Sequence, residues 1–112
     1  MKIERTQEGR VVIVQVGGVI KLGSSAKSFA AYLEGLLDED VPAVLLDLET
    51  IDSVDSTGLG ELVGYLQRFA ERGKRLALLR PPRKIHNLLH LTRLSEVFPI
   101  FESRAQALSE LQ

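Results

Sequence analysis

The stretch Ile51-Asp52-Ser53-Val54-Asp55-Ser56-Thr57-Gly58-Leu59-Gly60 decides how this chain is expected to fold. It follows an apolar run over residues 43–48, which is typical of a buried strand, and it precedes a run with helical spacing. The stretch therefore places a carboxylate and two hydroxyls where a helix begins. Backbone N–H groups at a helix start have no intrahelical partner, so oxygen ligands and phosphates are stabilised there. We expect Ser56 to lie at the centre of whatever the protein does.

The downstream half of the chain alternates helices and strands. One apolar stripe of a helix is formed by Leu59, Leu62, Val63, Leu66 and Phe69. Gly73 is expected to cap that helix at its C-terminal end. Then follow a buried strand over residues 75–80, a short helix around residues 85–91 and a last strand over residues 97–101. Pro99 places that strand at a sheet edge, and Ser103 is expected to cap a final helix.

The upstream half begins with a predicted hairpin. Residues 3–6 and 11–16 form its strands, and Gly17-Gly18 are expected to end the second one. Ser24 or Ser25 is expected to cap the next helix. The complete order is β-β-α-β-α-β-α-β-α, which predicts an α/β fold with a mostly parallel five-stranded sheet and about four helices. Residues 1–112 form one domain in this interpretation.

Composition excludes several classes of function. The chain has 112 residues, 45% of them apolar, which allows one core without a disulfide or a metal. It has no cysteine, which excludes a thiol nucleophile and a thiolate metal site. Fourteen basic and 15 acidic residues give a net charge of −1, so the clustered positive charge that nucleic-acid binding needs is absent. No apolar run approaches the roughly 20 residues of a membrane span. We expect a cytoplasmic protein without membrane insertion.

The sequence around Ser56 resembles the signature of the STAS family, which includes the anti-sigma factor antagonists and a domain of sulphate transporters. The resemblance covers nearly the whole chain, including the Gly73 turn before Leu76–Leu79 and the tail helix with Ala107-Leu108. It implies a STAS fold and a regulatory binding protein that is not an enzyme and needs no cofactor. Taken by residue type alone, Asp-Ser-Thr-Gly is also an ordinary helix cap and turn.

The resemblance further implies a switch. Antagonists of this family bind an anti-sigma factor that is also a serine kinase, and the bound kinase releases its sigma factor. The kinase phosphorylates the serine after the motif aspartate, here Ser56, the modified form no longer binds, and a phosphatase resets it. The implied partner-binding residues around that serine are Asp55, Thr57, Gly58, Leu59 and Gly60. The two glycines are expected to let a partner or a phosphate approach closely, and Leu59 to be either a contact or a core residue.

One segment departs from the family pattern. Where family antagonists often have Gly-Glu-Ile-Asp, this chain has Gly18-Val19-Ile20-Lys21. Because that aspartate is thought to help the kinase encounter, Lys21 reverses a charge in the expected binding surface and leaves open which kinase acts, and whether any does. The alternative is a constitutive STAS scaffold in a stress-signalling complex, or the soluble component of a lipid transporter.

Three other constellations are weaker. His86 and His90 lie four residues apart on a predicted helix, but no third metal ligand accompanies them, so exposed histidines are favoured. No Gly-x-Ser-x-Gly elbow surrounds Ser56, which argues against a hydrolase. A basic stretch is interpreted as a solvated face, with a partner footprint as the minor alternative. It comprises Lys74, Arg75, Arg80, Arg83 and Lys84.

Overall fold

The centre of the fold is a pair of apolar parallel strands. A computed structural model describes all 112 residues. In it β2 (Val11–Ile20) pairs in parallel with β3 (Ala43–Asp47), with Val11 opposite Ala43. Both strands are buried on both faces, as their near-continuous apolar sequences predict. β1 (Lys2–Glu8) runs antiparallel to β2 after a tight turn at Gly9, whose φ of 59° suits glycine.

The remaining strands extend the sheet in two directions. β5 (Leu76–Leu79) pairs in parallel with β3, and β6 (Ile100–Phe101) pairs in parallel with β5. The order along the sheet is β1-β2-β3-β5-β6, so Pro99 does precede an edge strand. A sixth strand that the sequence did not predict, β4 (Ile51–Val54), pairs in parallel with the far end of β2. The mostly parallel α/β domain with four helices is thus confirmed, with six strands in place of five.

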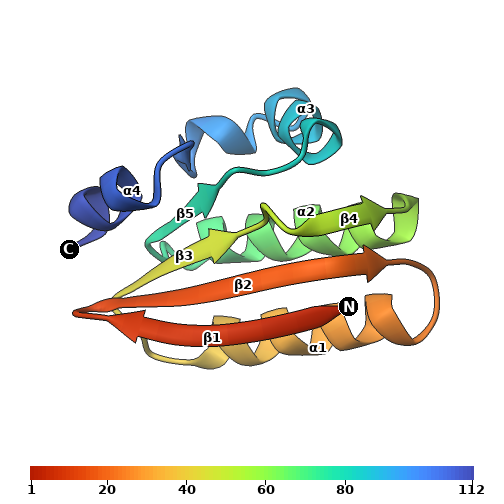
Figure 1. Cartoon of the computed structure of the whole chain (residues 1–112), viewed down its shortest axis with the longest axis horizontal. Helices are drawn as coiled ribbons and strands as arrows, with labels where there is room; N and C mark the ends of the chain where they lie inside the picture. The colour runs from red at the N-terminus through yellow and green to blue at the C-terminus, as the bar shows by residue number, and fades with distance from the viewer.

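Helices cover both faces of the sheet unequally. α1 (Ser24–Asp38) and α2 (Ser56–Glu71) lie side by side along one face (Figure 1). With α3 (Arg83–Leu91) they enclose the larger part of the core, which contains Phe29, Phe69 and Phe98. α4 (Arg104–Leu111) covers part of the other face through Ala107 and Leu111. None of these helices combines the length and apolar character that crossing a bilayer requires.

The predicted end of the second strand at Gly17-Gly18 is wrong. β2 continues to Ile20 through an irregularity between Gly18 and Val19. A Cβ on Gly17 would lie 2.6 Å from Oγ1 of Thr50, which belongs to the connection between β3 and β4. Because Gly17 has no side chain, this connection can pack directly against β2. These glycines therefore permit a tertiary contact rather than a chain reversal.

Two further expectations are corrected. Neither Ser24 nor Ser25 caps α1, because its N-cap is Gly23, and the Ser25 hydroxyl instead accepts the N–H of Lys21 at 2.9 Å. The last strand begins at Ile100 and not at Val97. The backbone N–H groups of Val97 and Phe98 both donate to the carbonyl of Leu94, at 3.1 and 2.8 Å, so they continue the 3-10 turn over Leu94–Glu96. By contrast, Ser103 caps α4 by accepting the N–H of Gln106 at 3.3 Å, as predicted.

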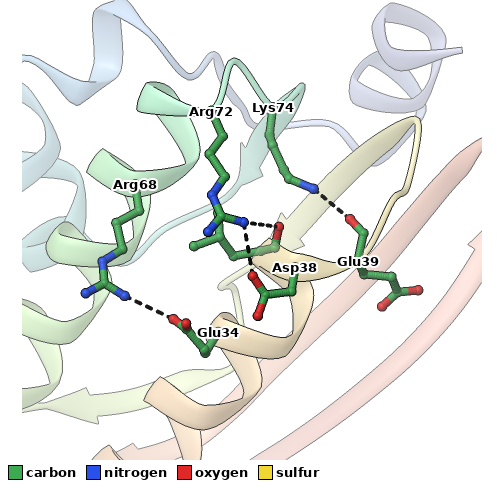
Figure 2. Close-up of polar contacts among 7 residues, drawn as sticks. Glu34, Asp38, Glu39, Arg68, Arg72 and Lys74 are labelled. Atoms are coloured by element: carbon green, nitrogen blue, oxygen red, sulfur yellow. Dashed lines mark hydrogen bonds and ion pairs between the residues drawn. The ribbon is translucent and has the colours of Figure 1, made fainter.

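The C-terminal ends of α1 and α2 are joined by polar contacts (Figure 2). Arg72 donates to the carbonyl of Leu37 at 3.2 Å and to the carboxylate of Asp38 at 3.0 Å. Lys74 donates to the carbonyl of Glu39 at 2.6 Å. These side chains satisfy carbonyls at the end of α1 that have no helical partner. The two helices that flank the sheet are therefore fixed to each other at the end opposite Ser56.

Candidate functional site

Asp55 organises the beginning of α2. It is the N-cap residue, and its Oδ1 accepts the backbone N–H of Gly58 at 2.9 Å. Its second oxygen, Oδ2, accepts the backbone N–H of Leu22 at 2.9 Å. The backbone N–H of Asp55 donates to the carbonyl of Ile20 at 3.0 Å. The bond to Gly58 caps α2, and the other two join the start of α2 to the end of β2 and the turn that follows it.

These contacts keep the Asp55 carboxyl charged. The backbone N–H of Gly58, and then that of Leu22, lower the pKa of Asp55 from its ordinary value, against a smaller opposing effect of desolvation. The backbone of Thr57 and the charge of Lys84 lower the pKa of Asp55 further. Hydrogen bonds to a carboxylate favour its ionised form, so the cap is negative at neutral pH.

Ser56 is the first residue of α2, and its side chain is exposed. The sequence-based expectation of a hydroxyl at the mouth of a helix therefore agrees with the geometry. Thr57, the neighbouring hydroxyl, is half-buried. Of the two, Ser56 is the more accessible to a modifying enzyme, and at this position backbone N–H groups and the helix dipole favour an added negative charge.

The two glycines of the motif have different surroundings. A Cβ on Gly58 would lie 2.7 Å from methyl groups of Ile20 and Val54, so the missing side chain allows close packing inside the chain. A Cβ on Gly60 would meet nothing within 4 Å, and the residue is exposed. Leu59 is half-buried and packs against the main core. Only Gly60 leaves open space beside Ser56.

The β2–α1 turn contributes a residue that the sequence analysis missed. Leu22 is 75% exposed, although large apolar side chains are usually covered. Its backbone N–H is the one held by Asp55, which places it beside the start of α2. Lys21 precedes it and is exposed, and Val19 is 40% exposed. An apolar residue between Lys21 and Gly23 in a predicted turn was the available sequence signal.

The basic stretch that the sequence suggested is not one patch. Lys74 binds the end of α1, Arg75 donates to the carbonyl of Glu110 at 2.6 Å, and Arg80 pairs with Glu49 at 3.1 Å. Lys84 alone reaches the site, where its Nζ donates to the carbonyl of Val54 at 3.0 Å. All of the five residues except Lys74 are exposed, as expected of a solvated face, but four of them make separate contacts.

The two histidines lie together, as their spacing predicts. The ring centroids of His86 and His90 are 4.6 Å apart, and Nδ1 of His90 lies 3.1 Å from the hydroxyl of Ser95. No group of three or more potential metal-ligating His, Cys, Asp or Glu side chains occurs in the chain. The pair lacks the third protein ligand that zinc sites usually have.

Comparisons with known proteins agree on one family. The model of the STAS domain matches residues 2–107. The chain is 25% identical to the anti-sigma F factor antagonist of Paenibacillus polymyxa over 112 residues, which is 100% of this chain and 96% of that protein. Its fold is similar to the crystal structure of an anti-sigma factor antagonist from Mycobacterium paratuberculosis (TM-score 0.78, 22% identity, 98% of this chain and 92% of that one). It is also similar to the phosphorylated form of the Bacillus cell fate determinant SpoIIAA (TM-score 0.78, 15% identity, 99% and 100%).

Proposed function

Because the chain belongs to the STAS domain family, and its relatives are named anti-sigma factor antagonists, we propose that it binds an anti-sigma factor serine kinase and is released when that kinase phosphorylates Ser56. The general role, antagonism of an anti-sigma factor, is that of the relatives. The kinase, the serine and the release are the specific parts of the proposal. In this role the chain is a binding partner and a phosphoacceptor, with no catalytic group of its own.

The observation that supports the proposal most directly is the position of Ser56. Its side chain is exposed at the first residue of a 16-residue helix, on a backbone that Asp55 fixes through two hydrogen bonds. A kinase needs an accessible hydroxyl, and this one is presented by a rigid element. The similarity in fold to SpoIIAA, whose phosphorylated form has been solved, is compatible with a folded phosphorylated state.

Energetics favour a switch in binding without a change in fold. A phosphoryl group adds a charge of roughly −1.5 to −2. At the N-terminus of a helix, that charge is stabilised by about 0.3–1 kcal/mol. In a closed interface, the same charge loses its water, and an unpaired buried charge costs about 2–5 kcal/mol. The cost of burying the phosphate in the interface exceeds its stabilisation at the helix N-terminus. The phosphorylated chain therefore stays folded and loses its partner.

A kinase assay tests this function. Expression of the chain with a kinase of the anti-sigma class should increase its intact mass by one phosphoryl group that maps to Ser56. The increase should vanish in Ser56→Ala and persist in Ser53→Ala, a matched control because Ser53 is an exposed serine three residues earlier. A kinase that binds the chain tightly but leaves its mass unchanged would contradict the switch and favour the constitutive scaffold.

Reset of the switch requires a phosphatase. The phosphoryl group at Ser56 would project from an exposed residue, which leaves it open to hydrolysis by a second enzyme. A serine phosphatase should therefore remove the group from the folded chain and restore kinase binding. Retention of the group until the chain is unfolded would contradict this part of the proposal.

A further inference from the structure

We propose that Lys84 is the intramolecular partner of a phosphoryl group on Ser56, so that the modified serine is bound by the chain itself. The inference rests on the proposed function in one respect, that Ser56 is the acceptor. It adds a residue from a different helix and a different part of the sequence to the site.

The position of Lys84 follows from one hydrogen bond. Lys84 is the second residue of α3, and its Nζ donates to the carbonyl oxygen of Val54 at 3.0 Å. Val54 stands two residues before Ser56 at the end of β4. Two residues of extended chain cover at most about 7 Å. The ammonium group therefore lies within the combined reach of its own flexible stem and a phosphoserine side chain.

Lys84 has unused capacity to bind an anion. An ammonium group has three N–H donors, and Val54 accepts only one of them. Lys84 takes part in none of the ion pairs of the chain, so no carboxylate oxygen lies within ion-pair distance of its ammonium group. Its charge already acts on the turn, since it contributes to the lowered pKa of Asp55. Lys84 can keep its bond to Val54 and donate a second N–H to a phosphate oxygen.

Other charges at the site determine how the effect must be measured. The segments next to Ser56 also carry other charged groups, namely Asp52, Asp55, Glu61, Lys21 and Arg83. The carboxylate of Asp55 is the nearest in sequence and opposes the second ionisation of the phosphate. The contribution of Lys84 is therefore obtained as a difference between variants in which these groups are unchanged.

The test uses the full chain with phosphoserine incorporated at position 56 during translation, so that no kinase is needed. The pKa of the second ionisation of the phosphate, about 6 in an unperturbed phosphoserine, is followed by phosphorus NMR. Removal of the charge in Lys84→Met should raise that pKa by about 0.3–1 unit, as expected for loss of a nearby cation at a solvated surface. Lys84→Arg, which keeps the charge, should leave it within about 0.2 unit of the parent chain.

Two further variants separate phosphate binding from a structural role. Lys84→Gln retains a donor for the Val54 carbonyl but no charge, so it should behave like Lys84→Met. Arg83→Met removes a neighbouring positive charge from an exposed residue that makes no hydrogen bond to the turn. It should therefore shift the phosphate pKa by less than half of the shift in Lys84→Met. Equal shifts in Lys84→Met and Arg83→Met, or a parent-like pKa in Lys84→Gln, would overturn the proposal.

The outcome is independent of the kinase assay. Failure of the kinase to modify Ser56 would leave the NMR titration and its conclusion unchanged. Conversely, an unshifted phosphate pKa in every Lys84 variant would remove Lys84 from the site and leave Ser56 as the acceptor. Lys84 is exposed, and an unchanged Tm of each unmodified variant, to within about 2 °C, checks that the fold is retained.

Discussion

The carboxylate of Asp55 accepts the backbone N–H of Leu22 at 2.9 Å, across 33 residues of sequence. Through its other oxygen the same carboxylate caps α2. The turn that presents Lys21 and Leu22 and the helix that presents Ser56 are therefore held by one side chain. Any partner that contacts both segments meets a surface whose parts are already in place.

The double acceptor role of Asp55 predicts a pH-dependent effect of Asp55→Asn. The amide has one carbonyl oxygen, so only one of the two N–H donors keeps its acceptor. In the folded chain the pKa of Asp55 lies below its ordinary value, so the charged carboxylate stabilises the fold above the pKa of the unfolded chain, about 3.9. That stabilisation is lost as the pH falls through the lowered folded-state pKa.

At pH 7, Asp55→Asn should lower Tm by roughly 4–8 °C, the shift expected when one hydrogen bond worth about 1 kcal/mol is lost from a domain of this size. Thermal unfolding can be followed by circular dichroism between about pH 7 and pH 2.5. The difference in Tm between the parent chain and Asp55→Asn should become smaller below about pH 4. A difference in Tm that stays constant down to the lowest pH would contradict the stabilising role of the ionised Asp55 carboxylate.

Gly58 and Gly60 should respond to alanine in opposite directions. In Gly58→Ala, the new methyl group would meet Ile20 and Val54 at 2.7 Å, and the overpacking should outweigh the gain in helix propensity, with a net loss of about 1–2 kcal/mol. Gly60→Ala has open space and should gain about 0.5–1 kcal/mol. Urea unfolding measures both. Two variants of equal stability would show that the contact at Gly58 relaxes without cost.

The contacts in Figure 2 should differ in strength although they look alike. Arg72 binds the carbonyl of Leu37 as well as Asp38, so Arg72→Met should cost about 0.5–1.5 kcal/mol. Arg68 pairs with Glu34, both about half exposed, and its guanidinium lies over the Tyr65 ring, 5.0 Å from the ring centroid, without binding any backbone carbonyl. Arg68→Met should therefore cost about 0–1 kcal/mol, and less in 0.5 M salt. Chemical unfolding at two salt concentrations separates them, and a larger loss for Arg68→Met would contradict the argument.

Leu22 should matter for binding and not for folding. Its side chain is 75% exposed, so Leu22→Ala should change stability by less than about 0.5 kcal/mol. If Leu22 lies in the interface, kinase affinity should fall about fivefold or more, which corresponds to about 1 kcal/mol or more. Leu91→Ala is the control, because Leu91 is 81% exposed at the far end of α3. Equal effects of both variants on affinity, measured by calorimetry, would exclude Leu22 from the interface.

Lys21 should determine the rate of the encounter with the kinase. Charges at an interface rim mainly change the association rate. Lys21→Asp restores the charge of the family pattern, so it should change the association rate with a family kinase about twofold or more while the dissociation rate stays similar. Lys27→Asp, an exposed lysine one turn into α1, is the matched control. Surface plasmon resonance measures the association and dissociation rates. Equal changes of the association rate in Lys21→Asp and Lys27→Asp would show that the net charge of the chain, and not the position of Lys21, causes the effect.

The elements that the sequence predicted well are those with long, uninterrupted patterns. β3 and β5 are apolar at nearly every position and are buried throughout. In α2 the apolar stripe supplies the buried residues Leu62, Leu66 and Phe69. The cap at Ser103 was also predictable, because its hydrogen bond is made to Gln106, three residues further along the chain. In these segments the local sequence pattern alone indicated the secondary structure that the chain adopts.

The failures occurred where distant residues decide the local structure. β4 has four residues, and its central Asp52 and Ser53 are exposed, so it has no strand pattern of its own. It exists because β2 continues past Gly17 and supplies a partner. In the same way, the exposure of Leu22 and the approach of Lys84 to Val54 depend on contacts across more than 25 residues, which composition and spacing do not contain.

The fixed backbone around Ser56 has a consequence for how the proposed kinase would recognise it. Many kinases bind a flexible segment and spend part of the interaction energy on ordering it. Here the backbone of Ser56, the proposed acceptor, is already ordered by Asp55, and the surrounding surface is assembled from segments that are far apart in sequence. Recognition of this hydroxyl is therefore a property of the folded shape, and a short linear peptide with the same residues would be a poor substrate.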